Sequence, residues 1–293
     1  MEDQYIESNG LRICYDEFGD ASKPCILLIM GLGAQMIAWR ETFCQKLAGQ
    51  GFRVIRFDNR DIGLSEKIEQ APPGMMSLIG AGLLGLQLNT PYDLNDMAKD
   101  AVGVLDALDV HAAHIVGASM GGMIAQIVAA KYSDRVLSLT SIMSTTGAKH
   151  LPKASTKVNV LMLKRRAKNE EQRLKNSMAL WRVIGSPAYQ PSDEELTDRI
   201  LSSYRRNFCP AGYLRQLGAI TVSGDRVELL KTVNLPTLVI HGAADVLVPV
   251  EGGRHTAELV AGSRLRIYDG MGHDLPTELH DNIVSEIVEI ASH

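Results

Sequence analysis

The sequence predicts an α/β protein with a mainly parallel sheet flanked by helices, and a helical insertion within it. Apolar runs typical of strands buried on both faces recur along the chain. Helical segments separate them, so that strand, helix and strand alternate at least three times. From about residue 146 to residue 232 only helical patterns appear, and the alternation then resumes to the C-terminus.

Length and composition are those of a globular protein. The 293 residues are 45% hydrophobic and 22% charged, which is enough to bury a sizeable core. A net charge of −4 gives no reason to expect a nucleic-acid partner. The four cysteines show neither C-x-x-C spacing nor nearby histidines, so we expect free thiols in a reducing compartment and no metal or other cofactor. They are Cys14, Cys25, Cys44 and Cys209.

No targeting or membrane-spanning segment is expected. The first four residues are acidic in character, and no long apolar core follows them as it would in a signal peptide. The most apolar segment, residues 75–88, is interrupted by glycines and is shorter than the roughly 20 residues needed to span a bilayer. The sequence therefore predicts a cytoplasmic protein.

The elements of the core follow in order along the chain. Two alternating segments flank Asn9-Gly10, which predicts an antiparallel hairpin at the start. The predicted buried strands span residues 25–29, 53–57, 114–117, 136–142, 235–240 and 264–268. The predicted helices of the core span residues 36–50, 94–108, 123–131, 250–259 and 277–290.

Residues 66–91 form a long connection for a compact domain, where loops beyond about 12 to 15 residues are often functional. Their centre, residues 75–86, is apolar and rich in glycine. Two interpretations stay open. The segment is either a short helix buried in the core or a lid-like insertion that faces the substrate.

The helical insertion, residues 146–232, is the expected cap on a core made of residues 1–145 and 233–293. It contains predicted helices at 158–168 and 170–184, and a third that begins with a capping box at Ser192 and Glu195. Between Lys149 and Arg182, ten Lys or Arg residues stand against two Glu residues, a local charge of +8. A solvated helix face explains this charge most simply, and the alternative is attraction of an anionic substrate or lipid surface.

The segment Gly117-Ala118-Ser119-Met120-Gly121 lies between an apolar run and a helical pattern, which predicts a strand, a sharp turn and a helix. Glycine is needed two positions before and after the serine because a Cβ there would collide with the neighbouring strand or helix. Such a turn lifts the Ser119 hydroxyl clear of the sheet. It also leaves the Met120 N–H at the positive end of the new helix, where it can hold an oxyanion.

Two further side chains follow the carboxyl ends of late strands. Asp245 follows the strand predicted at 235–240, and His273 lies in a glycine-rich turn after the strand predicted at 264–268. Ligand sites of open α/β sheets lie along that rim. A serine nucleophile needs a base, and the base needs an orienting carboxylate. Asp225 and Asp269 are alternative acids, and His241 is interpreted as structural.

These motifs give a resemblance that covers the whole chain. The order Ser, Asp, His is that of α/β-hydrolases, and the chain is similar to them at the nucleophile elbow 117–121, the acid loop 242–249 and the histidine loop 270–273. Residues 58–65 resemble the D-x-R-G-x-G-x-S turn of that family, with Asp61 where glycine is usual. Within it, the chain looks most like bacterial carboxylesterases of the aclacinomycin methylesterase and mycobacterial esterase/lipase type, which share the D-N-R-D form and a helical cap.

The resemblance implies a Ser119, His273 and Asp245 triad and oxyanion donors at the N–H groups of Leu32 and Met120. The donor segment departs from the family, because Met30-Gly31 stands where His-Gly is usual. The expected function is hydrolysis of short to medium acyl esters of a small-molecule substrate through an acyl-enzyme. Alternatives are a lipase, phospholipase or thioesterase on acyl lipids, and a ligand-binding protein without catalysis. Weak contact with an anionic lipid surface stays open, and the sequence does not predict an oligomeric state.

Overall fold

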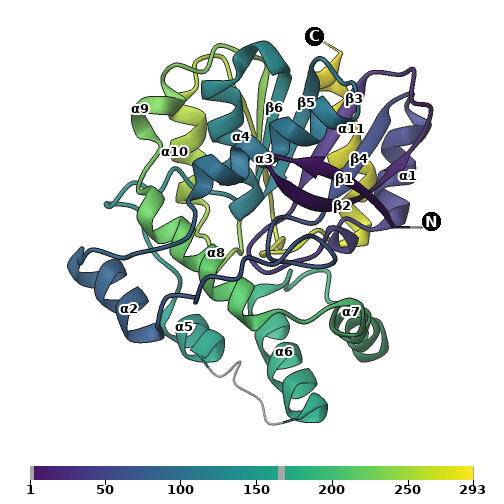
Figure 1. Cartoon of the computed structure of the whole chain (residues 1–293). Helices are drawn as coiled ribbons and strands as arrows, with labels where there is room; N and C mark the ends of the chain where they lie inside the picture. The colour runs from purple at the N-terminus through teal and green to yellow at the C-terminus, as the bar shows by residue number, and fades with distance from the viewer. Residues whose placement is uncertain (1–2, 164–168, 293) are drawn as a thin grey trace.

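A computed structural model describes residues 3–163 and 169–292, and in them an eight-stranded sheet lies between layers of helices (Figure 1). The strand order is β1-β2-β4-β3-β5-β6-β7-β8. β1 pairs with β2 and β2 with β4 in antiparallel fashion, and the remaining neighbours are parallel. The strands are β1 (Gln4–Ser8), β2 (Leu11–Phe18), β3 (Cys25–Ile29), β4 (Arg53–Phe57), β5 (Ala113–Ala118), β6 (Val136–Ile142), β7 (Thr237–Gly242) and β8 (Arg264–Tyr268). The predicted fold class is confirmed.

The hairpin between β1 and β2 turns at the dipeptide that predicted it. Asn9 and Gly10 both have positive φ, 50° and 74°, the conformation that a two-residue hairpin loop with the twist of the flanking strands requires. Ser8 pairs with Leu11 across the turn. The antiparallel pair therefore caps one edge of the parallel part of the sheet.

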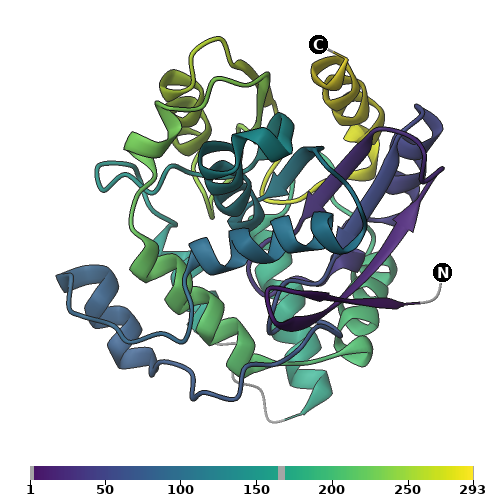
Figure 2. The same cartoon turned by 45° about the horizontal axis from the view of Figure 1, so that its top comes forward.

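Side chains of each central strand alternate between two apolar cores, one on each face of the sheet. Leu27 and Ile29 belong to the core under α3, α4, α9 and α10, whereas Ile26 and Leu28 belong to the core under α1 and α11. Figure 2 shows these two layers from a second direction. The helices of the layers are α1 (Glu41–Gly49), α3 (Leu94–Ala107), α4 (Met120–Lys131), α9 (Val227–Leu230), α10 (Glu251–Leu259) and α11 (His280–Ala291). Burial on both faces is why β3, β5 and β7 appear as continuous apolar runs.

Of the five described helices between β6 and β7, the first four form the cap. They lie together at one end of the molecule (Figure 1). They are α5 (Thr156–Leu163), α6 (Glu170–Ile184), α7 (Asp193–Arg206) and α8 (Pro210–Ser223). The helix predicted at 158–168 extends into residues 164–168, which lie outside the described residues. α8 was not predicted from the sequence, although proline, here Pro210, is common in the first turn of a helix.

The apolar insertion contains a helix of its own, α2 (Met75–Leu84), which ends at Gly85 with φ of 66°. Leu78 is buried, whereas Met76 and Leu84 are 80% and 75% exposed. A helix buried in the core is therefore the wrong interpretation of this segment, and a substrate-facing role stays a prediction. Within residues 3–163 and 169–292, every helix falls short of the length and apolar character that crossing a bilayer demands.

Candidate active site

The turn between β5 and α4 has the strained geometry expected of a nucleophile elbow. Ser119 has φ of 57° and ψ of −119°, in the region that non-glycine residues rarely adopt. A Cβ added to Gly117 would lie 2.1 Å from the Gly121 carbonyl oxygen. One added to Gly121 would lie 2.0 Å from the carbonyl oxygen of Ile29 in β3. Strand, turn and helix thus approach so closely that only glycine fits on either side of the serine.

Ser119, His273 and Asp245 come together in a hydrogen-bonded series at the carboxyl ends of the parallel strands. His273 Nε2 lies 3.0 Å from Ser119 Oγ, and His273 Nδ1 lies 2.7 Å from Asp245 Oδ2. His273 and Asp245 are buried, at 8% and 5% exposed, whereas Ser119 is half-buried. The serine side of the imidazole can therefore accept a proton while the other nitrogen stays bound to the carboxylate.

The Asp245 carboxylate is held ionised by its surroundings. Burial raises the pKa of this group, but the charge of His273 and hydrogen bonds from histidine and backbone groups outweigh it, so the pKa lies below the ordinary 3.8. Oδ1 accepts hydrogen bonds from the N–H groups of Leu247 and Val248, each at 2.9 Å. Asp225 and Asp269, the alternative acids, are both exposed.

His241 lies beside the acid but outside the series. Its Nε2 is 2.8 Å from the Val248 carbonyl oxygen and 3.6 Å from Asp245 Oδ2, and the residue is fully buried. The ring also packs against Gly253 of α10, where an added Cβ would lie 2.5 Å from His241 Nδ1. These contacts brace the acid loop, in keeping with the structural role expected from the sequence.

The segment after β3 runs directly beside the serine. A Cβ added to Gly31 would lie 3.0 Å from Ser119 Cβ and 3.5 Å from Ser119 Oγ. Leu32 follows at once, and Met120 begins α4, so its N–H belongs to the first turn, where helix N–H groups lack intrahelical acceptors. The two expected oxyanion donors thus belong to segments that border the serine.

Two amide side chains hold the donor segment, and the sequence analysis identified neither. Asn59 Nδ2 donates to the Met30 carbonyl oxygen at 2.8 Å, and the Gly33 N–H donates to Gln216 Oε1 at 2.9 Å. Gln216 comes from α8, so a cap helix fixes a segment of the core. The Met30 side chain, which replaces the usual histidine, is only 8% exposed and packs in the apolar core under α1 and α11.

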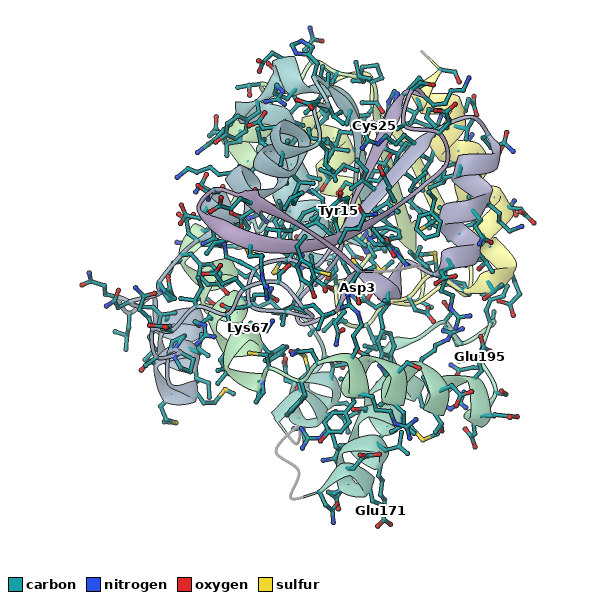
Figure 3. All side chains as sticks on the ribbon, turned by 45° about the vertical axis from the view of Figure 1, so that its right-hand side comes forward. Asp3, Tyr15, Cys25, Lys67, Glu171 and Glu195 are labelled. Atoms are coloured by element: carbon teal, nitrogen blue, oxygen red, sulfur yellow. The ribbon has the colours of Figure 1, made fainter. Side chains whose placement is uncertain are left out.

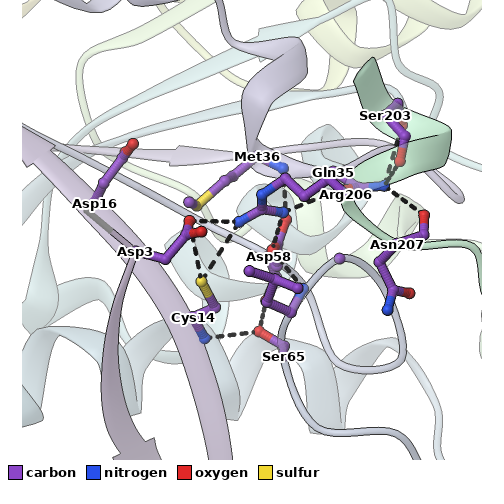
Figure 4. Close-up of polar contacts among 12 residues, drawn as sticks. Asp3, Cys14, Asp16, Gln35, Met36, Asp58, Ser65, Ser203, Arg206 and Asn207 are labelled. Atoms are coloured by element: carbon purple, nitrogen blue, oxygen red, sulfur yellow. Dashed lines mark hydrogen bonds and ion pairs between the residues drawn. The ribbon is translucent and has the colours of Figure 1, made fainter. Parts of the chain in front are cut away.

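Asp58 ties the turn after β4 to the cap (Figure 4). This carboxylate is fully buried and accepts hydrogen bonds from the Met36 N–H at 2.7 Å and the Leu64 N–H at 2.9 Å. Arg206 of α7 completes the arrangement, with Nη1 2.6 Å from Asp58 Oδ2 and Nη2 2.8 Å from Asp3 Oδ1. One arginine therefore joins the cap, the turn and the N-terminal segment.

The conformation and contacts of Asp61 explain why this residue can stand where the family usually has glycine. Its φ is 74°, a conformation that favours glycine and that Asp tolerates better than most other residues. The buried carboxylate binds Arg215 of α8 through two hydrogen bonds of 2.8 and 2.7 Å. It also accepts from the Tyr92 hydroxyl at 2.6 Å and the Ile68 N–H at 2.9 Å. Asp61 thus binds the cap and both ends of the apolar insertion at one point.

The histidine loop is bound to the cap through Ser186, which follows α6. The Ser186 N–H donates to Asp274 Oδ1 at 3.0 Å, its hydroxyl donates to the same oxygen, and the Gly272 N–H donates to Ser186 Oγ at 2.9 Å. The His273 N–H donates to the Ile184 carbonyl oxygen at 2.6 Å. Burial raises the pKa of Asp274, although its hydrogen bonds with Ser186 oppose that change. No sequence motif identified Ser186.

A more exposed contact joins the cap to the other flank of the core. Glu195 of α7 lies 3.0 Å from Arg40, which precedes α1, and Figure 3 shows Glu195 beside the core while Glu171 stands at the outer end of the cap. Only the serine half of the predicted capping box of α7 is present, in which the Glu195 N–H donates to Ser192 Oγ at 3.1 Å. The Glu195 side chain pairs with Arg40 and Arg199.

Three of the four cysteines are buried as free thiols. Among the described residues, no group of three or more His, Cys, Asp or Glu side chains is arranged to hold a metal ion. Burial raises the pKa of the Cys14, Cys25 and Cys44 thiols to about 12, so these groups stay protonated at neutral pH.

Comparison with known proteins defines the class to which this fold and site belong. Residues 24–176 match the family model of the alpha/beta hydrolase fold, and the chain belongs to that family. It is 26% identical to rhodomycin D methylesterase DauP of Streptomyces sp. strain C5, over 98% of this chain and 97% of that protein. It is 24% identical to the bifunctional esterase/perhydrolase DCH of Acinetobacter calcoaceticus, over 96% of each. The resemblance inferred from the motifs is confirmed at the level of the family.

Solved structures give the same fold. The enol-lactonase from Burkholderia xenovorans LB400 superposes with a TM-score of 0.77 at 22% identity, covering 99% of this chain and 100% of that one. The esterase RhEst1 from Rhodococcus sp. ECU1013 superposes with a TM-score of 0.76 at 21% identity, covering 100% and 99%. Because both identities are low, these likenesses concern the fold alone.

Proposed function

We propose that the protein is a serine carboxylesterase that hydrolyses short to medium acyl esters. The observation that carries the proposal is the hydrogen-bonded series from Ser119 through His273 to Asp245, with the serine in a strained turn beside two segments that can donate N–H groups. A serine hydroxyl is a weak nucleophile until a base removes its proton. The series supplies that base and the carboxylate that orients it.

In the proposed reaction His273 Nε2 takes the Ser119 proton as Oγ attacks the ester carbonyl carbon. The oxyanion of the tetrahedral intermediate accepts hydrogen bonds from the Leu32 and Met120 N–H groups, and Asp245 stabilises the imidazolium. His273 then protonates the leaving alcohol oxygen, and an acyl-enzyme remains. Water attacks this ester with His273 again as base, and the acid leaves with Ser119 restored.

Support for ester chemistry comes from relatives of full length that are named methylesterase and esterase/perhydrolase. Relatives named methylesterase support a substrate whose alcohol group is small. Lipase, phospholipase or thioesterase action on acyl lipids uses the same series of residues, so the series does not select among them. A panel of esters in which acyl and alcohol lengths vary independently separates these substrate classes.

The test of the chemistry is hydrolysis of a short p-nitrophenyl ester by the wild type and by Ser119→Ala. We expect turnover to fall by at least about 1,000-fold, because removing one oxyanion donor alone costs on the order of 100- to 1,000-fold. Labelling with a fluorophosphonate should occur in the wild type and disappear in the variant. Unchanged turnover in Ser119→Ala would reject the mechanism, and no labelling of the wild type would favour a ligand-binding protein without catalysis.

A further inference from the structure

Large apolar side chains reach the surface mainly at the cap end of the molecule. Of the eleven exposed large hydrophobic residues among the described ones, eight belong to the insertion 66–91 or to the cap, which together make up well under half of the chain. These eight are Met76, Ile79, Leu84, Leu86, Val160, Trp181, Phe208 and Val222. Contiguous apolar exposure marks a surface that meets a partner, and four of the eight, Met76, Ile79, Leu84 and Leu86, belong to α2 and the turn after it.

The helix α2 is the most exposed part of this surface. Met76, Leu84 and Leu86 are 80%, 75% and 58% exposed, and residues 71–92 contain no Asp, Glu, Lys, Arg or His. Figure 1 shows α2 standing out from the body of the protein at the end where the cap lies. Such a helix has no polar outer face for water to solvate.

The base of α2 is nevertheless firmly attached. Leu78 is 6% exposed, and the flanking chain packs on α8 at Gly218, where an added Cβ would lie 2.7 Å from Thr90 Cγ2 and 3.0 Å from Pro73 Cγ. Residues on both sides of α2 are therefore seated on the cap while its outer side chains stay exposed. Because α2 is already folded and attached at its base, its exposed apolar side chains can bind a partner without a loss of conformational entropy in the helix.

A basic stretch of the chain leads into α5, which lies at the same end of the molecule as α2 (Figure 1). No Asp or Glu occurs from residue 135 to residue 169, whereas Lys149, Lys153 and Lys157 lie in that stretch and are exposed. Lys157 belongs to the first turn of α5, and Val160 of the same helix is 45% exposed. The basic residues of the sequence analysis that fall at 164–168 lie outside the described residues. The chain as a whole is negative, at −4, so the charge of this stretch is opposite to that of the whole chain.

We infer that α2 and the basic segment 149–160 form a docking surface for an anionic phospholipid bilayer. Exposed apolar side chains enter the boundary between headgroups and acyl chains, and lysines beside them are attracted to anionic headgroups. The charge favours this occupant over a second copy of the chain, because two identical basic segments would repel each other when α2 faces α2. This inference concerns binding and does not rest on the proposed esterase activity.

The test is co-sedimentation of the full chain with vesicles of phosphatidylcholine, with and without phosphatidylglycerol. We expect binding to the vesicles that contain phosphatidylglycerol, and weaker binding as salt rises from about 0.02 M to about 0.5 M, which screens exposed charges. Met76→Gln with Leu84→Gln should lower binding by about tenfold or more, because both side chains then enter the interface poorly. Lys149→Gln, Lys153→Gln and Lys157→Gln should each lower binding by roughly fivefold.

The matched control is Leu137→Gln, since Leu137 is also exposed, at 45%, but lies at the amino end of β6, away from the cap. It should bind vesicles like the wild type. The lysine variants leave α2 untouched, so they keep the test valid if the double variant does not fold. Absence of wild-type binding to any vesicle, or equal loss in Leu137→Gln, would overturn the inference. An oligomer in gel filtration that Met76→Gln with Leu84→Gln converts to a monomer would overturn it too, because a second copy then covers α2.

Discussion

The serine turn and the seam between core and cap are held together by different forces. At the turn, Gly117 and Gly121 let backbone atoms of β3, β5 and α4 approach so closely that a single methyl group would not fit. At the seam, buried ion pairs join Asp58 to Arg206 and Asp61 to Arg215, partners that are 148 and 154 residues apart. The turn is fixed by sterics between backbone atoms in direct contact, whereas the seam depends on charged side chains that the cap brings to the core.

The difference matters because the two kinds of contact tolerate change differently. Sterics at the turn allow one residue type, and any larger one displaces the serine. Burying an ion pair has an unfavourable desolvation free energy. Removing one partner destabilises the fold further, because the other charge is then buried without compensation. Three changes test this contrast, from the largest expected effect to the smallest.

The change Gly121→Ala acts on the turn. The added methyl group would collide with the Ile29 carbonyl oxygen, so α4 must shift away from β3. We expect ester turnover to fall on the order of 1,000-fold, because Ser119 moves relative to both its base and the Met120 N–H. Gly49→Ala is the control, since a Cβ at Gly49 meets nothing within 4 Å and turnover should stay unchanged. Wild-type turnover in Gly121→Ala would show that the turn is not governed by sterics.

The change Arg215→Met acts on the seam. It keeps an unbranched apolar side chain in place of the arginine stem but leaves the buried Asp61 carboxylate without its guanidinium. We expect the free energy of unfolding in urea to fall by about 3 kcal/mol. The double variant Asp61→Asn with Arg215→Met should recover part of that loss, because asparagine is neutral and tolerates the positive φ of residue 61. Equal stability of the single and double variants would mean that the uncompensated charge is not the cause.

The third change, His114→Gln, tests how the stability of the core depends on pH. Burial lowers the pKa of this β5 residue from 6.5 to about 4, although it keeps a 2.9 Å contact with Ser138 Oγ. The unfolded chain binds the proton first as pH falls, so stability is full above about pH 6.5 and declines towards pH 4. We expect a loss of about 2 kcal/mol between pH 7 and pH 5 that His114→Gln removes.

Urea unfolding of the wild type and His114→Gln at each pH provides that measurement. Burial also lowers the pKa of His280, but His280 titrates in both proteins, so the difference between their curves isolates His114. Identical pH dependence in the two proteins would contradict the assignment to His114.

The sequence predicts the core well because its signals are local. β3 and β6 have the bounds predicted from the sequence, since β3 is buried at every position and β6 at every position except Leu137. Ser119, Asp245 and His273 follow strand ends and glycine-rich turns, so their meeting at one rim follows from the parallel sheet. The helix predicted at 36–50 differs in detail, because a short 3₁₀ turn and a break at Arg40 come before α1.

The seam was beyond such reasoning for a physical reason. Arg215 and Gln216 lie in α8, a helix that was not predicted from the sequence, and their partners lie far away in the chain. Asp61 was visible only as a departure from the glycine usual at its position. Spacing along one sequence does not say which arginine reaches which buried carboxylate, and Ser186, which holds the histidine loop, belongs to no motif.

The place of the cap in the chain also sets the order in which the site is assembled during synthesis. β3 is synthesised before β5 and the serine turn, and β6 directly after them. This half of the sheet can therefore pair early. β7 and β8 follow the whole cap and add at the free edge beside β6 without reopening the strands already paired. Asp245 and His273 arrive with them. A nascent chain that has not yet reached β7 therefore carries Ser119 without Asp245 and His273, and the hydrogen-bonded series is completed only after β8 has been synthesised.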